Sequence, residues 1–447
     1  MNSEIFVKSS PTKLFFQCSI PAVITSVFGA LYSIVDGIFV GKYLGENALA
    51  AVNLIMPTIM IVEAISNMIA TGASVQMSIL LGQNKREQAS SVFSFSVFFI
   101  LCFSCLVGIL GFWFAKPFLM LLSPGANKQV LAFGIDYLQI YAVFAPLVPI
   151  FFAMDNYLRV CGKQQLSMGL NIISQIGNVV LDFILIAVLH QGVKAAAVAS
   201  CIFIAAGSVI SLLLFRGRRM DVFYTKKVIS FKQFSQIIVN GMSEFFSSIS
   251  ASVTSIILNL FLLHYGGTTA VAAFSVVMYA DSLIGMMSFG ICDSLQPAIS
   301  YCYGAKLYDR MKEIWKRILS AMVLLSILSF LFLFFIGPYT TKLFVQKNDI
   351  ELLKTSITAI KLFSFSYLVG WIDTCFSSLF TALECPIRSL LISLFGTLLF
   401  PILFVTLLTA IYGLNGIWLT ETVAAIASGI ITLIMAKTLK IGGKALI

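Results

Sequence analysis

Long apolar runs separated by short polar loops recur along the whole chain. Each run exceeds the roughly 20 residues that a helix needs to cross a bilayer. The runs are too long and too uniformly apolar for the alternating strands of a membrane barrel. The pattern therefore predicts twelve membrane-spanning helices, at about 14–40, 48–81, 90–114, 131–158, 166–189, 193–215, 238–263, 270–302, 318–340, 355–383, 389–411 and 414–436.

The composition leads to the same class of protein. Of the 447 residues, 59% are hydrophobic and only 11% are charged, whereas about 25% of the residues of a soluble domain are charged. So few charges cannot cover the surface of a soluble globule, which disfavours soluble, disordered and nucleic-acid-binding proteins. Twelve spans leave room for short loops only, so no separate soluble domain is expected.

The basic residues predict the orientation. If the N-terminus is inside, 21 of the 29 lysines and arginines fall on the inner side and 8 on the outer side. Because short cytoplasmic loops are enriched in basic residues, both termini are expected in the cytoplasm. The net charge of +10 then reflects topology and implies no nucleic-acid partner. The first apolar run is interpreted as a spanning helix rather than a removable signal.

The sequence matches itself at a shift of 222 residues. Residues 43–51 lie over 265–273, Gly82 lies over Gly304, and 159–167 lie over 381–389. Six spans followed by six spans in the same orientation form a parallel repeat, which is typical of secondary transporters. The expected fold is an all-α integral membrane protein with two six-helix bundles related by a pseudo-two-fold axis along the membrane normal. The expected domains are 1–215, a basic cytoplasmic linker at 216–235, and 236–447.

The spans contain acidic residues but essentially no basic ones. A charged carboxylate at the bilayer centre costs on the order of 2.5–3.5 kcal/mol. Without a basic partner, each acid must face water, bind a cation or take up a proton. This pattern favours a cation-handling transporter over a passive scaffold. The acids within apolar stretches are Asp36, Glu63, Asp182, Glu244, Asp281, Asp293 and Asp373.

Two acids of the first half are candidates for an ion site. Asn178 and Asp182 stand four residues apart on one helical face, where their oxygens can bind Na⁺ or the amide can bond a protonated acid. Asp36 follows Pro21 on the same helix, and a proline permits a bend. A buried acid bonded to a hydroxyl or amide is the alternative. The repeat partners of the two acids are Leu258 and Phe404, so this pair belongs to the first half alone.

The second half carries four acids, which are expected to line a substrate cavity or form a second proton site; ordinary structural hydrogen bonds are the alternative for each. They are Glu244, Asp281, Asp293 and Asp373. Near the inner face, Asp155 is expected to pair with Arg159. Cys102 and Cys105 are interpreted as small packing residues, because no second cysteine pair or nearby histidine accompanies them.

Several segments together resemble the multidrug and toxic compound extrusion (MATE) transporters, of the bacterial MepA-like and DinF-like type. They are VDGIFVGKYLGENALAAVNLIMP from 35, NVVLD at 178–182, GVKAAAVAS at 192–200, GMSEFFSSISASVTSIILNLFLLHYGG from 241 and LQPAISYCYGAK at 295–306. The resemblance covers both halves. It implies twelve helices that exchange Na⁺ or H⁺ inward for organic substrate outward.

The resemblance also assigns residues. It places Asp36, Asn178, Asp182 and Ser200 at a cation or proton site, with a possible Na⁺ at the first three; Ser200 stands where many members have threonine. Asp373 falls where many members have an acid in the tenth helix. The chain departs from the pattern at Ser243, often a proline, and at Glu384, commonly a glycine.

The expected function is an antiporter that exports organic, cationic amphipathic compounds by alternating access. We expect a monomer in the bacterial inner membrane, with no cofactor besides the coupling ion and no enzymatic activity. A lipid or lipid-linked-precursor flippase is the alternative, although an anionic pyrophosphate would favour basic residues that the spans lack. A membrane enzyme is disfavoured because no catalytic motif is found, and a channel because the acids form no ring.

Overall fold

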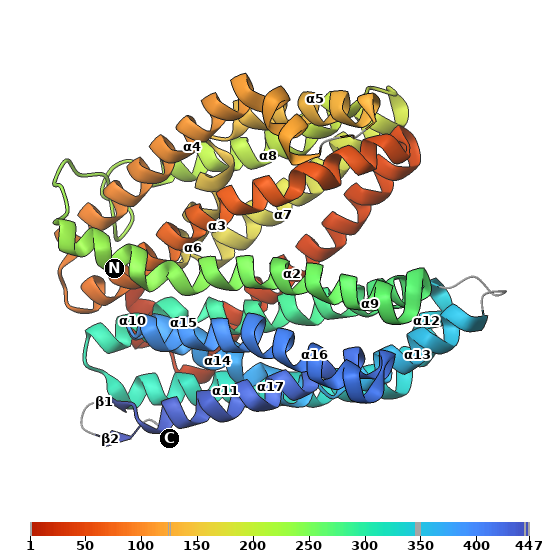
Figure 1. Ribbon diagram of the computed structural model, residues 1–447. Helices are drawn as coiled ribbons and strands as arrows, with labels where there is room; N and C mark the ends of the chain where they lie inside the picture. The colour runs from red at the N-terminus through yellow and green to blue at the C-terminus, as the bar shows by residue number, and fades with distance from the viewer. Residues whose placement is uncertain (1, 124, 126, 345–349, 442–443, 446–447) are drawn as a thin grey trace. The chain divides into compact units, whose positions relative to one another are not determined.

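The computed structural model describes residues 2–123, 125, 127–344, 350–441 and 444–445, and nearly all of them are helical (Figure 1). The α-helices are α1 (Ile5–Lys8), α2 (Pro11–Phe39), α3 (Glu46–Gly82), α4 (Arg86–Leu122), α5 (Lys128–Phe144), α6 (Val148–Val160), α7 (Gln164–Asp182), α8 (Val193–Leu214), α9 (Phe231–Ser294), α10 (Gln296–Gly304), α11 (Tyr308–Leu331), α12 (Gly337–Phe344), α13 (Ile350–Ser364), α14 (Tyr367–Ala382), α15 (Pro386–Leu394), α16 (Phe400–Tyr412) and α17 (Leu414–Lys437).

Short elements complete the chain. One 3₁₀ turn, η1 (Asn2–Glu4), precedes α1, and four π-helical segments extend longer helices: η2 (Val40–Leu44), η3 (Phe183–Val188), η4 (Phe332–Ile336) and η5 (Phe395–Leu399). Strands β1 (Lys440–Ile441) and β2 (Lys444–Ala445) pair antiparallel.

The helices account for the expected twelve spans. Within the described residues, nine helical segments are long and apolar enough to cross a membrane, and two bent pairs, α5 with α6 and α13 with α14, can each form one more. The segment that contains α9 holds two helices, because Gly267 interrupts it with a left-handed backbone (φ 62°, ψ −158°). Counting the α9 segment as two spans, the nine segments become ten, and the two bent pairs bring the total to twelve.

The chain forms two compact units, which are described separately below. Over the described residues, unit 1 comprises Met1–Lys8 and Ile24–Gly241, and unit 2 comprises Ser9–Val23 and Met242–Ile447. In each, helices lie side by side around an apolar core: Ile55, Tyr137 and Ile186 are central in unit 1, and Phe274 and Trp418 in unit 2.

The observed division differs from the expected one at the first helix of each half. The first part of α2 packs in unit 2, where the Ser19 and Ser294 hydroxyls are 3.2 Å apart and Arg317 donates to Thr12. The first part of α9 packs in unit 1, where Gln76 donates to the Gln233 carbonyl. These local contacts are the physical reason for the difference. Residues 216–230 of the expected linker have neither helix nor strand, and α9 begins at Phe231.

The repeat of 222 residues holds in the backbone. Left-handed residues occur in pairs at this shift: Gly45 with Gly267, Asn84 with Lys306, and Gly162 with Glu384. Helix starts match as well, since α4 begins at Arg86 and α11 at Tyr308, while α7 begins at Gln164 and α15 at Pro386. The two halves therefore share one order of helices and turns.

The repeat includes a place where two helices approach closely, and in unit 1 these helices are α3 and the first part of α9. A Cβ on Gly72 would lie 1.9 Å from the Ile237 carbonyl oxygen, and one on Gly241 would lie 1.9 Å from that of Met68. At the 222-residue shift these glycines correspond to Ser294 and Ser19, the pair whose hydroxyls meet in unit 2. Small residues thus permit close approach of the helices in both halves.

Replacing Glu384 by glycine is expected to stabilise the protein. Glu384 is exposed and has a φ of 51° where its repeat partner is Gly162, and a left-handed conformation costs an L-residue about 1–2 kcal/mol. Part of this gain is lost to the greater entropy of unfolded glycine, so a net gain of about 1 kcal/mol or less is expected. It would appear as a higher thermal unfolding midpoint of the purified protein. Glu313→Gly, at an exposed position within α11, should lower the midpoint; a fall for Glu384→Gly too would contradict the prediction.

Candidate functional site

A cluster of buried and half-buried polar side chains lies within unit 1. Asp36 comes from α2, Asn178 and Asp182 from the last turns of α7, and Ser200 from α8. Asp182 is fully buried and Asn178 is 2% exposed. The carboxyl groups of Asp36 and Asp182 are close enough to interact. The structure thus brings together the two acids that the sequence separates by 146 positions.

The cluster has more buried polar atoms than partners. Both side-chain polar atoms of Asn178, both carboxylate oxygens of Asp182 and one oxygen of Asp36 are buried without a hydrogen bond of normal geometry to the part of the chain that the structure describes. Burying such atoms unpaired is costly. Two neighbouring carboxylates also repel each other unless a proton or a cation lies between them. The arrangement can therefore hold a proton or a small cation.

The surroundings of the cluster are aromatic and hydroxylic. Tyr32 and Tyr137 lie against Ser200, whose hydroxyl donates to the Ala196 carbonyl at 3.0 Å. The Ser200 hydroxyl therefore lies between two tyrosines at the edge of the cluster. The π-helical η3 begins directly after Asp182, and such segments are frequent at functional sites.

Pro21 lies inside α2, 15 residues before Asp36. Two residues after this proline, between Val23 and Ile24, the helix passes from unit 2 to unit 1. A proline removes one helical hydrogen bond and weakens the helix where it stands. The position suits a bend, which stays a prediction.

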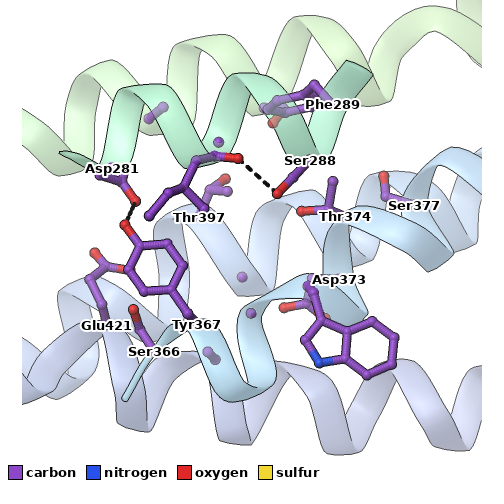
Figure 2. A pocket seen from close by; sticks show the side chains of 18 of the residues that line it. Asp281, Ser288, Phe289, Ser366, Tyr367, Asp373, Thr374, Ser377, Thr397 and Glu421 are labelled. Atoms are coloured by element: carbon purple, nitrogen blue, oxygen red, sulfur yellow. Dashed lines mark hydrogen bonds between the residues drawn. The ribbon is translucent and has the colours of Figure 1, made fainter. Parts of the chain in front are cut away.

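A cavity of about 460 Å³ lies within unit 2 (Figure 2). All four acids predicted for the second half line it, together with serines, threonines and apolar side chains. Three of these acids accept a hydrogen bond from a neighbouring hydroxyl. The bonds join Tyr367 to Asp281 (2.7 Å), Ser378 to Asp293 (3.2 Å) and Thr432 to Asp373 (2.6 Å).

The hydroxyl partners fix the directions of these carboxylates without neutralising them. Figure 2 shows Asp281 from α9 and Tyr367 from α14 pointing toward each other. Among the described residues, neither lysine nor arginine lines the cavity, and no three His, Cys, Asp or Glu side chains are arranged to hold a metal ion. The cavity is thus suited to attract cations through its carboxylates.

A family model described as MatE matches the chain twice, at residues 21–184 and 245–407. Together these two segments cover well over half of the sequence. The chain belongs to the MatE family.

Known proteins are similar to this MatE chain over nearly its whole length. Multidrug export protein MepA of Staphylococcus aureus (strain MSSA476) is 26% identical over 450 residues, covering 99% of this chain and 98% of that protein. Among solved structures, a MATE protein in complex with MaL6 has a TM-score of 0.91 at 21% identity, covering 97% of both chains. An outward-facing multidrug resistance MATE family transporter of the MOP superfamily has a TM-score of 0.88 at 22% identity, again covering 97% of both. The fold of this multi-pass membrane protein is that of the MATE transporters, with twelve helices in two bundles.

One acid of the cavity is not among those predicted from the sequence of this MatE chain. Glu421 on α17 lines the cavity of unit 2 and lies near Asp281 and Tyr367 (Figure 2). The signal was present, because Glu421 is the one acid in the apolar stretch 414–436.

The remaining expectations can be placed as well. Asp155 and Arg159 form the expected ion pair at 2.5 Å, and Ser167 and Asn171 also donate to Asp155.

Ser243 lies 3.3 Å from the Thr381 hydroxyl within unit 2. Cys102 and Cys105 are exposed on α4, and Glu63 is half-buried on α3.

Proposed function

We propose that the chain is a secondary active exporter that moves organic cations outward in exchange for inward Na⁺ or H⁺. The observation that carries this proposal is the cluster of Asp36, Asn178 and Asp182, in which most of the buried side-chain oxygens have no hydrogen bond of normal geometry to the described residues. Such a cluster is costly unless an ion or proton occupies it, so its occupancy provides a coupling energy. The name of the full-length relative MepA, a multidrug export protein, supports the same direction of transport.

Coupling requires that the ion and the substrate prefer different conformations. In this proposal an ion from outside binds at Asp36 and Asp182 and removes their mutual repulsion. Because Asp36 and Pro21 share α2, occupancy of the cluster favours a different shape of this helix. The affinity for substrate then falls and the substrate leaves outward.

The substrate class follows from the cavity in unit 2. Its carboxylates attract positive charge, and apolar side chains such as Phe274, Met278 and Phe363 offer surface for hydrophobic groups. We therefore propose cationic amphipathic compounds as cargo. The proposal includes a monomer in the bacterial cytoplasmic membrane with both termini inside, no cofactor beyond the coupling ion and no catalysis.

A lipid or lipid-linked-precursor flippase is the competing function. Its anionic headgroup would require basic side chains, and among the described residues the cavity wall contains acids but no lysine or arginine. Movement of an anionic lipid by the purified protein, without export of organic cations, would favour the flippase.

The decisive measurement is efflux of a fluorescent organic cation from proteoliposomes in which Na⁺ and pH gradients are imposed separately. We expect export driven by an inward gradient of one or both ions and no net export without a gradient. Equal flux with and without gradients would overturn the proposal, because it would indicate passive conduction.

A further inference from the structure

The acids around the cavity of unit 2 form two pairs. Asp293 and Glu244 are near enough for their charges to act on each other, and so are Asp281 and Glu421. The fifth acid, Asp373, is held by Thr432 and lies on α14 between Tyr367 and Ser378, the residues that hold Asp281 and Asp293.

The two pairs have the same construction. In each pair the aspartate comes from α9 and accepts a hydrogen bond from a hydroxyl of α14, namely Ser378 for Asp293 and Tyr367 for Asp281. The glutamate of each pair, Glu244 or Glu421, accepts no hydrogen bond from the described residues. Its carboxylate oxygens are accessible from the cavity. Each pair therefore combines one oriented carboxylate with one that is available to a ligand in the cavity.

The spacing of the pairs follows from α9. Asp281 and Asp293 are twelve residues apart on its continuous second part, which at 1.5 Å per residue is about 18 Å along the helix axis. Ile284, Gly285, Ser288 and Phe289 line the wall between them. The cavity thus has a pair of acids toward each end of an uncharged α9 wall, and the single acid Asp373 lies on α14 between Tyr367 and Ser378.

We propose that this cavity selects organic dications whose two positive groups are far enough apart to reach both pairs at once. A monocation satisfies one pair and leaves the other without a counter-charge, whereas a length-matched dication satisfies both. A short dication would place both charges near one pair, where they repel each other. This inference rests on the proposed export of organic cations and specifies the substrate class of the same cavity.

The test is a series of bis(trimethylammonium)alkanes with four, eight, ten and twelve methylene groups, measured for binding to and efflux by the purified protein. Each is compared with the monocation of the same alkyl length, which matches the length of the apolar chain. We expect the ratio of dication to monocation affinity to be near one for the shortest member and to rise to about tenfold at a matched length, as one additional charge contact can supply.

Two variants locate the effect. Glu421→Gln and Glu244→Gln remove the available carboxylate at opposite ends, so each should bring the best dication down to the affinity of its monocation. Both glutamates line the cavity, so the readout is the ratio of dication to monocation affinity rather than the monocation affinity alone. Glu63→Gln, which changes a half-buried acid of unit 1, is the control and should keep the length preference.

The outcomes separate the two proposals. Efflux of monocations with a dication ratio near one at every length would overturn the two-pair inference and leave the proposed export intact. Failure to bind or export any member of either series would count against the proposed export itself. A length preference that survives both glutamine variants would also overturn the inference, because it would then arise elsewhere.

Discussion

Ion-driven efflux is expected to fall by about tenfold to a hundredfold when Asp36 is replaced by asparagine. The amide keeps the shape of the side chain but takes up no proton and offers no charge to a cation. Contacts of charged groups are worth about 1.5–3 kcal/mol, which corresponds to the stated loss. The measurement is gradient-driven efflux from proteoliposomes that contain equal amounts of folded wild-type and Asp36→Asn protein.

Asp136→Asn is the matched control for this result. Asp136 is an acid of the same unit, but its side chain is 37% exposed and pairs with Lys194 at 3.2 Å, so its loss should leave efflux within about twofold, as expected for a surface ion pair. Substrate binding to Asp36→Asn under equilibrium conditions should persist, because the cavity lies within unit 2. If Asp36→Asn showed the same efflux rate as the wild type, the assignment of Asp36 to the coupling site would be contradicted.

A second large effect is expected from one methyl group on Gly72. The Cβ of Gly72→Ala would lie 1.9 Å from the Ile237 carbonyl oxygen, and a backbone atom cannot move aside as a flexible side chain can. Helices α3 and α9 must separate, with a loss of about 1–3 kcal/mol or more. The variant should show a clearly lower unfolding midpoint or a reduced yield of monodisperse protein. The Cβ of Gly241→Ala would lie at the same distance from the Met68 carbonyl oxygen, so this variant should be destabilised in the same way.

Gly169→Ala provides the contrast. Gly169 is also helical and in unit 1, but nothing lies within 4 Å of the position of its Cβ. Because alanine is the better helix former, this variant should be neutral or more stable by up to about 1 kcal/mol. If Gly72→Ala retained the wild-type midpoint while Gly169→Ala behaved as expected, the close approach of α3 and α9 would be contradicted.

The sequence was informative wherever the signal is local. Asn178 and Asp182 could be placed on one face because their spacing of four residues fixes this within a single helix. The turns at Gly45 and Gly267 could be matched by a shift in register, since the same backbone conformation favours the same residue type in both halves. The number and order of spans could be predicted because each span must be apolar by itself to enter a bilayer.

What the sequence by itself determined is therefore the membrane class, the twelve spans, the repeat and the set of acids that needs an explanation. The resemblance read from the sequence had already placed Asp36 and Asp182 at one site, and only the tertiary structure decided that Glu244 meets Asp293 and Asp281 meets Glu421. It also decided that the first parts of α2 and α9 pack in the units formed by the other half of the sequence. The physical reason is that insertion into a bilayer depends on the composition of each segment, whereas the meeting of side chains from separate helices depends on how those helices pack.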